Sequence, residues 1–145
     1  MQVQPAVQER NWAMAAHLSA LVAVAGLPFG HVLGPLVVYL IKGHEAEFVA
    51  EHARASLNYQ ITVSIFAIVA VIVAVAATLG FLIPMSEANQ SGDVTAPISF
   101  AVLWMFFAAA VLVVVLASIV FIILGTIAAS EGRPYTYPFA IRFLR

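Results

Sequence analysis

The sequence predicts an all-α integral membrane protein built as a four-helix transmembrane bundle, and three observations lead to this class. Of the 145 residues, 63% are hydrophobic and only 9% are charged. The mean hydropathy is +1.04, and a soluble domain could not cover so much apolar surface with so few charges. Asp, Glu, Lys and Arg are absent from residues 12–41, 57–83 and 97–130. Because a helix crosses the hydrocarbon core with about 20 residues, each tract is long enough to enter a membrane.

The four expected passages belong to a single transmembrane domain over 1–145. The second and third tracts each predict one passage, at about 55–83 and 98–129. The first tract contains Pro28, Gly30, Gly34 and Pro35, which should break it into a hairpin of passages at about 11–27 and 31–42. The return arm either starts near His31 or is a half-helix that begins at Pro35. A three-passage topology, with the first tract as one bent span, is the alternative.

The basic residues set the expected orientation. With four passages, all six fall on one side of the membrane: Arg10, Lys42, Arg54, Arg133, Arg142 and Arg145. Since Lys and Arg mark cytoplasmic segments, both termini and the segment 43–54 should be cytoplasmic. The outer loop 84–97 carries only Glu87 and Asp93.

Two features near the chain ends complete the expected organisation. The tail 131–145 should lie along the membrane surface, with Tyr135, Tyr137 and Arg142 at headgroup level. A cleavable signal peptide ending near Ala25 is a weaker reading of the N-terminal tract, because His17 interrupts the apolar run and the run continues beyond Ala25.

Polar residues inside apolar tracts are the candidate functional groups, because lipid does not tolerate them unpaired. The pattern predicts a cluster near the cytoplasmic surface formed by His17, Glu51, His52, Asn58 and Gln60. The favoured interpretation is that these side chains tie helices together by hydrogen bonds. A proton or ion relay and haem ligation by the two histidines are the alternatives.

No spacing in the chain matches a zinc protease motif, a phosphate loop or a nucleophile elbow. There is no cysteine either, so disulfides and thiol chemistry are excluded. We therefore expect no catalytic residue, no metal ligand set, no cofactor and no enzymatic activity.

Several motifs also carry a family resemblance. They are Asn11-Trp12-Ala13-Met14, His17-Leu18-Ser19-Ala20, Gly34 to Lys42, Leu57-Asn58-Tyr59-Gln60 and Gly132-Arg133-Pro134-Tyr135-Thr136-Tyr137-Pro138. In order and spacing the chain resembles small bacterial membrane proteins of unknown function that are grouped with the chloroplast Tic translocon inner-envelope membrane subunit. The resemblance implies four helices in the bacterial cytoplasmic (inner) membrane, with 84–97 as a periplasmic loop. It also implies a role in protein translocation or membrane-protein assembly.

Two functional hypotheses follow from these features. The first is a non-enzymatic subunit that contacts the lipid bilayer and associates with itself or with other membrane proteins, and not with nucleic acid. The alternative is a small ion or proton channel or transporter that uses the cytoplasmic polar cluster.

Overall fold

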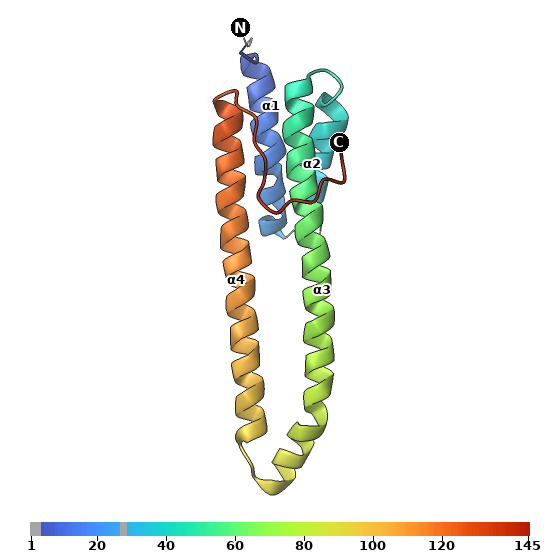
Figure 1. Cartoon of the computed structure of the whole chain (residues 1–145), viewed down its shortest axis with the longest axis vertical. Coiled ribbons are helices and arrows are strands. Elements are labelled where there is room, and N and C mark those ends of the chain that lie inside the picture. Colours follow the sequence, from blue (N-terminus) through green and yellow to red (C-terminus); the bar gives the residue numbers. More distant parts are fainter. Residues whose placement is uncertain (1–3, 27–28) are drawn as a thin grey trace. The chain divides into compact units, whose positions relative to one another are not determined.

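The computed structural model describes residues 4–26 and 29–145 and is all-α over these residues, which confirms the all-α part of the predicted class (Figure 1). The four-passage transmembrane bundle stays a prediction. Its elements are, in chain order, α1 (Val7–Leu18), the 3₁₀ helix η1 (Ser19–Ala25), α2 (Gly30–Lys42), α3 (Glu47–Ser91) and α4 (Thr95–Ser130). Two of these helices, α3 and α4, are long and apolar enough to cross a membrane.

The chain divides into two compact units. Unit 1 consists of the residues up to Ser64 together with Ser118–Arg145, and unit 2 is Ile65–Ala117. Both α3 and α4 therefore contribute one end to each unit.

The first hairpin, in unit 1, is broken as predicted but differs in detail. Helix α1 gives way to the tighter η1 at Ser19, and α2 begins at Gly30 with Pro35 inside it. The return arm thus starts before Pro35, and the alternative of a half-helix from Pro35 is wrong. Pro28, which we expected to help break the tract, lies outside the described residues.

Glycine at position 34 allows the two arms of this hairpin to approach. A Cβ added there would lie 2.4 Å from the Ser19 carbonyl oxygen, a distance that no side chain tolerates. Because α2 has 13 residues, it is only about 20 Å long. That is shorter than the hydrocarbon core of about 30 Å.

The apolar core of unit 1 joins α1, α2 and α3. Its buried members are Ala16, Val38, Val49 and Ala53, with Trp12 packed against them. The small residues Ala16 and Ala53 let the helix backbones approach closely, which is a common way for helices to pack in membrane proteins.

Unit 2 contains the remainder of the two long helices and their connection. Helix α3 continues through Pro84 to Ser91, so much of the segment 84–97 that we assigned to a loop is helical. The break is short, and the Asp93 carboxylate accepts a 2.9 Å hydrogen bond from the backbone N–H of Thr95 where α4 begins. Most side chains outside this connection are apolar, many of them are exposed, and none of the most apolar stretch of α3 is buried in protein. Such a surface is typical of helices that contact lipid.

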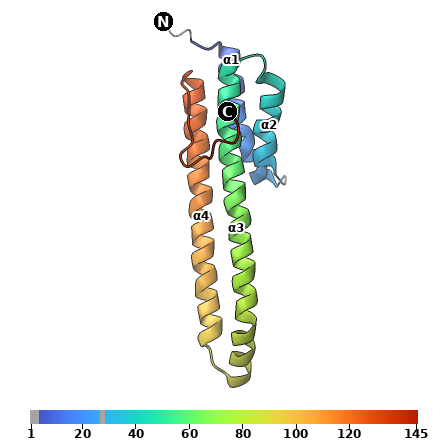
Figure 2. The ribbon, with the colours of Figure 1, turned by 45° about the vertical axis from the view of Figure 1, so that its right-hand side comes forward.

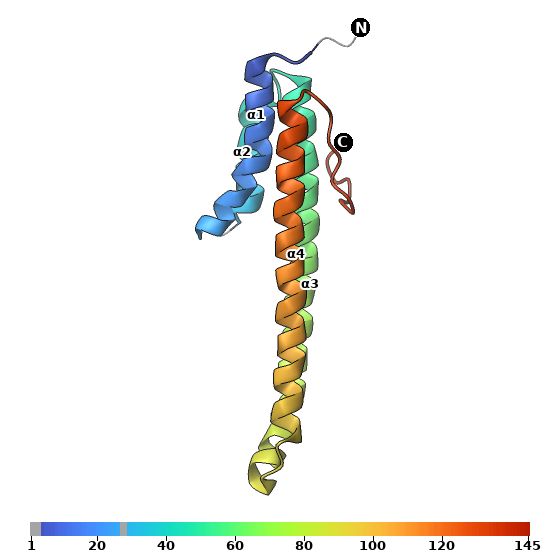
Figure 3. The ribbon, with the colours of Figure 1, turned by 90° about the vertical axis from the view of Figure 1, so that its left-hand side faces the viewer.

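The C-terminal tail, residues 131–145, has no helix and runs back along α3 within unit 1 (Figure 2). Figure 3 shows this tail and the α1–α2 hairpin on opposite sides of the α3–α4 pair. The Asn58 side chain holds the tail: its Oδ1 accepts from the backbone N–H groups of Phe143 (3.0 Å) and Leu144 (2.8 Å), and its Nδ2 donates to the Leu144 carbonyl (2.9 Å). A further bond runs from the Ile141 N–H to Thr62 Oγ1 at 3.0 Å.

Candidate functional site

The most distinctive site in the described residues is a chain of hydrogen bonds buried in unit 1. His17 lies in the last turn of α1, His52 lies in the second turn of α3, and Tyr137 comes from the tail. The His17 Nδ1 lies 2.8 Å from the Tyr137 hydroxyl, and its Nε2 lies 2.8 Å from His52 Nδ1. The other ring nitrogen of His52 lies 3.1 Å from the Arg133 carbonyl oxygen. All three side chains are buried.

The carbonyl at one end determines the direction of the whole chain. Because a carbonyl oxygen only accepts, His52 must donate from Nε2, and a neutral His52 then accepts at Nδ1. His17 must therefore donate from Nε2 and accept at Nδ1. It follows that the Tyr137 hydroxyl donates to His17, and every donor points from Tyr137 towards Arg133.

Gly125 in α4 makes this arrangement possible. A Cβ added at Gly125 would lie 2.9 Å from His17 Nδ1 and 3.1 Å from the Tyr135 ring. The missing side chain leaves space in which the His17 ring of α1 and the Tyr135 ring of the tail both pack against α4.

Aromatic rings pack against the hydrogen-bonded residues and help to bury them. Tyr59 stacks on Tyr137 with ring centroids 4.4 Å apart, and its hydroxyl lies 2.8 Å from Ser118 Oγ. The Phe48 and His52 rings pack edge to face, with their centroids 4.6 Å apart. Burial raises the pKa of Tyr137 above its ordinary value, so this hydroxyl stays protonated and remains a donor. The buried Ser56 hydroxyl has no well-aligned hydrogen bond in the described residues, although its proximity opposes part of that pKa shift.

The two histidines are arranged to bond to each other and not to a metal. Each of their four ring nitrogens already has a hydrogen-bond partner, and a separation of 2.8 Å leaves no space for an ion or a haem iron between them. Among the described residues, no group of three or more His, Cys, Asp or Glu side chains could hold a metal ion.

The structure joins only part of the predicted polar cluster. His17 and His52 meet, whereas Asn58 binds the tail and Gln60 is buried with its Nε2 lacking a partner in the described part of the chain. Glu51 is exposed and lies beside the tail.

The tail residues also divide. Tyr137 is buried in the hydrogen-bond chain, while Tyr135 is half-buried and Arg142 is exposed. Sequence reasoning missed the link from Tyr137 to His17, because no local pattern connects residues 120 positions apart. It also missed the 2.8 Å contact of His31 with Ser64, which joins α2 to α3.

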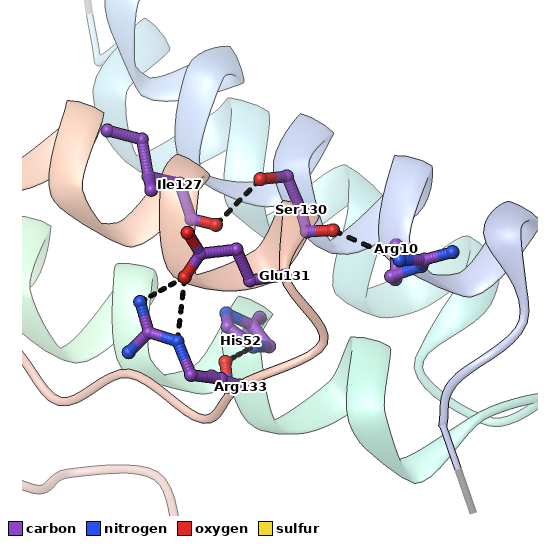
Figure 4. Close-up of polar contacts among 6 residues, drawn as sticks. All are labelled: Arg10, His52, Ile127, Ser130, Glu131 and Arg133. Atoms are coloured by element: carbon purple, nitrogen blue, oxygen red, sulfur yellow. Dashed lines mark hydrogen bonds and ion pairs between the residues drawn. The ribbon is translucent and has the colours of Figure 1, made fainter.

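The end of α4 is fastened to both neighbouring segments (Figure 4). Arg10 of α1 donates to the Ser130 carbonyl at 3.3 Å, and the Arg133 side chain pairs with Glu131. The Arg133 backbone carbonyl is the acceptor for His52. Within unit 1, the end of α4 is therefore held to α1 and α3 by contacts between segments that are distant in the sequence.

Comparison with known proteins identifies one family. The sequence of residues 8–144 matches the family model of the magnetosome magnetite crystal formation protein family. No curated protein and no solved structure matches the chain. The resemblance to the Tic translocon group is therefore wrong, and the translocation role that it implied has no support. The motifs that carried the resemblance lie inside the matched span, and nothing in helix periodicity or polarity distinguishes one membrane protein family from another.

Proposed function

Because the chain belongs to the magnetosome magnetite crystal formation protein family, we propose that it is an integral protein of the magnetosome membrane that takes part in magnetite crystal formation as a non-enzymatic subunit. The family match over 8–144 is the observation that carries this proposal. The two long apolar helices support residence in a membrane. The buried histidine chain supports a structural role, since its ring nitrogens are all engaged within the protein.

The proposed topology has four passages with both termini in the cytoplasm. All six Lys and Arg residues belong to unit 1, and residues 65–117 contain none, which agrees with a cytoplasmic location for unit 1. Helices α3 and α4 would each cross fully, and the α1–α2 hairpin would enter from the same side with α2 as its short arm. The connection that carries Glu87 and Asp93 would then face the vesicle interior.

Cysteine labelling tests this topology. The chain has no cysteine, so Asn89→Cys and Arg145→Cys each introduce one thiol. We expect a membrane-impermeant maleimide added to isolated, intact magnetosome vesicles to label position 145 and to reach position 89 only after permeabilisation. Labelling of both positions from the same side would overturn the proposed orientation.

Deletion of the gene in a magnetosome-forming bacterium tests the proposed function. We expect crystals of altered size or shape in electron micrographs, restored by the wild-type gene and not by His17→Ala. The matched control is His44→Ala, because His44 is exposed on the short connection between α2 and α3 and its loss should leave rescue intact. Crystals identical to those of the parent strain would contradict the proposal.

We further propose that the subunit works in contact with other membrane proteins or with copies of itself. The support is that helices α3 and α4 expose apolar side chains along their length. Purification in a mild detergent should recover a reproducible complex, and a strictly monomeric protein without partners would count against association.

Proton transfer is a second candidate function, favoured by the uniform donor direction from Tyr137 through His17 and His52. If the Tyr137 oxygen takes a proton from one side, each hydrogen-bonded proton can pass to the next acceptor, from Tyr137 to His17 and from His17 to His52. The His52 Nε2 proton must then leave to an acceptor such as water, because the Arg133 carbonyl cannot take it. If this occurs, proteoliposomes should show a proton flux that His17→Ala removes. An impermeable vesicle would exclude the channel hypothesis while leaving the structural role intact.

A further inference from the structure

A pocket of about 410 Å³ lies in unit 1 between the start of α3 and the C-terminal tail. Its polar lining comes mainly from Glu51, Arg54, Asn58, Tyr135, Arg142 and Arg145. Neither the histidine chain nor the family match accounts for this pocket.

The cations of the chain differ in how they are neutralised. Four of the six have a protein partner: Arg10 bonds to the Ser130 carbonyl, Lys42 pairs with Glu45, Arg54 with Glu47 and Arg133 with Glu131. Within the described residues, Arg142 and Arg145 have no such partner, and both line this pocket. Glu51 is the single acidic side chain of the lining. The pocket therefore holds unsatisfied positive charge.

The pocket also lies next to the part of α3 that must contact lipid. Arg54 is the last charged residue of α3 before its apolar stretch, and no charged residue occurs from Leu57 to Ile83. The residues of α3 that line the pocket end at Asn58. This is the level at which the chain passes from charged to apolar, where lipid headgroups reside.

The tail carries exposed apolar side chains among its arginines. Phe139 is 90% exposed, and Ile141 and Phe143 are about half exposed. Phe139 has a backbone φ of 63°, a left-handed conformation that is strained for a bulky residue, and its side chain points away from the protein. Apolar side chains in this setting fit acyl chains, while the arginines fit a headgroup.

We propose that this pocket binds the phosphate of an anionic phospholipid through Arg142 and Arg145. A guanidinium group offers paired N–H donors that match phosphate oxygens, and the hydroxyl groups of Tyr135 and Thr136 in the lining can add further donors. Free phosphate shares this chemistry. The exposed apolar side chains of the tail favour a lipid as its source.

Lipid binding to the full-length protein in detergent tests the proposal. The probes are phosphatidylglycerol and phosphatidylcholine, with bound lipid counted by native mass spectrometry. We expect a preference for phosphatidylglycerol that falls roughly 30-fold in Arg142→Gln/Arg145→Gln, since each basic residue near an anionic surface contributes about fivefold. The preference should also weaken with added salt.

The matched control is Lys42→Gln/Arg133→Gln, which removes the same charge from two side chains that already have partners and do not line the pocket. It should retain most of the preference, and circular dichroism should show both double variants folded. Equal loss in the two variants, or no loss in either, overturns the proposal. Inorganic phosphate forms the second arm: strong competition by millimolar phosphate without any preference between lipids would assign the site to a soluble anion and overturn the lipid assignment.

Discussion

Units 1 and 2 share the helices α3 and α4 but differ in which side chains they bury and which they expose. Apart from the buried indole N–H of Trp104, the buried polar side-chain groups of the described residues lie in unit 1, among them His17, His52 and Asn58. Unit 2 instead exposes apolar side chains along both helices and carries no basic residue. One region is specified by pairing between particular residues, and the other by composition. A substitution should therefore be costly in unit 1 and tolerated in unit 2 whenever the apolar character is kept.

The largest effect should come from His17→Ala in unit 1. The change removes two buried hydrogen bonds and leaves the Tyr137 hydroxyl and His52 Nδ1 without their partner. We expect the free energy of unfolding in detergent to fall by about 3 kcal/mol. His44→Ala, at an exposed position, should change it by less than about 0.5 kcal/mol. Similar values for the two variants would mean that the histidine chain contributes little to stability.

A pair of glycine substitutions compares the two units directly. Gly125→Ala places a Cβ 2.9 Å from His17 Nδ1, and we expect a loss of about 2 kcal/mol from overpacking. Gly80→Ala in unit 2 meets nothing within 4 Å, so it should be neutral or raise stability by about 0.5 kcal/mol. The melting temperatures of the two variants should be compared in the same detergent. A lower melting temperature for Gly80→Ala than for Gly125→Ala would contradict the close packing of His17 against Gly125.

Asn58→Leu should release the tail without unfolding the helices. Three hydrogen bonds to Phe143 and Leu144 are lost, which we expect to cost about 1 to 2 kcal/mol. Hydrogen exchange of the tail amides should accelerate while that of α1 does not. Asn58→Asp keeps the acceptor for both N–H groups and should show a smaller change. Equal exchange in all three proteins would show that Asn58 does not hold the tail.

Tyr137→Phe should have the smallest effect and a distinct pH dependence. It removes one donor, at a cost of about 1 kcal/mol. Burial raises the pKa of Tyr137 above 10.0 in the folded protein. Above pH about 10, the unfolded chain loses this proton while the folded protein keeps it, so stability falls as pH rises. The Phe variant should lose that part of the fall, as measured by the melting temperature between about pH 8 and 11. An unchanged pH profile would argue that Tyr137 is not buried.

The helical segments were largely predictable, and their ends were not. The charge-free tracts predicted the apolar parts of α3 and α4, but α3 continues through Pro84 to Ser91 where we expected a loop. The hairpin break was anticipated from Gly30, Gly34 and Pro35, although α2 starts at Gly30 and includes Pro35. Proline lacks one backbone donor, and a helix that is held by its neighbours can absorb that loss.

The candidate site was predictable in its residue types and not in its partners. Buried polar groups need hydrogen bonds, so His17, His52 and Asn58 were identifiable as residues with a structural or functional role. Their actual partners are Tyr137, Arg133 and the backbone of residues 143 and 144. The structure shows the tail docked on α3 through Asn58, a contact that the sequence did not indicate, and the location of the tail at the membrane surface stays a prediction.

By itself, the sequence determined the all-α class, the two long apolar helices and the absence of Lys and Arg from residues 65–117, because these depend on composition and on periodicity along the chain. The tertiary structure alone decided that His17 contacts His52, 35 residues away, and Tyr137, 120 residues away. These contacts depend on the space left by the missing side chain of Gly125 and on the tail turning back along α3. Both are set by packing between distant segments, which no local pattern of residues encodes.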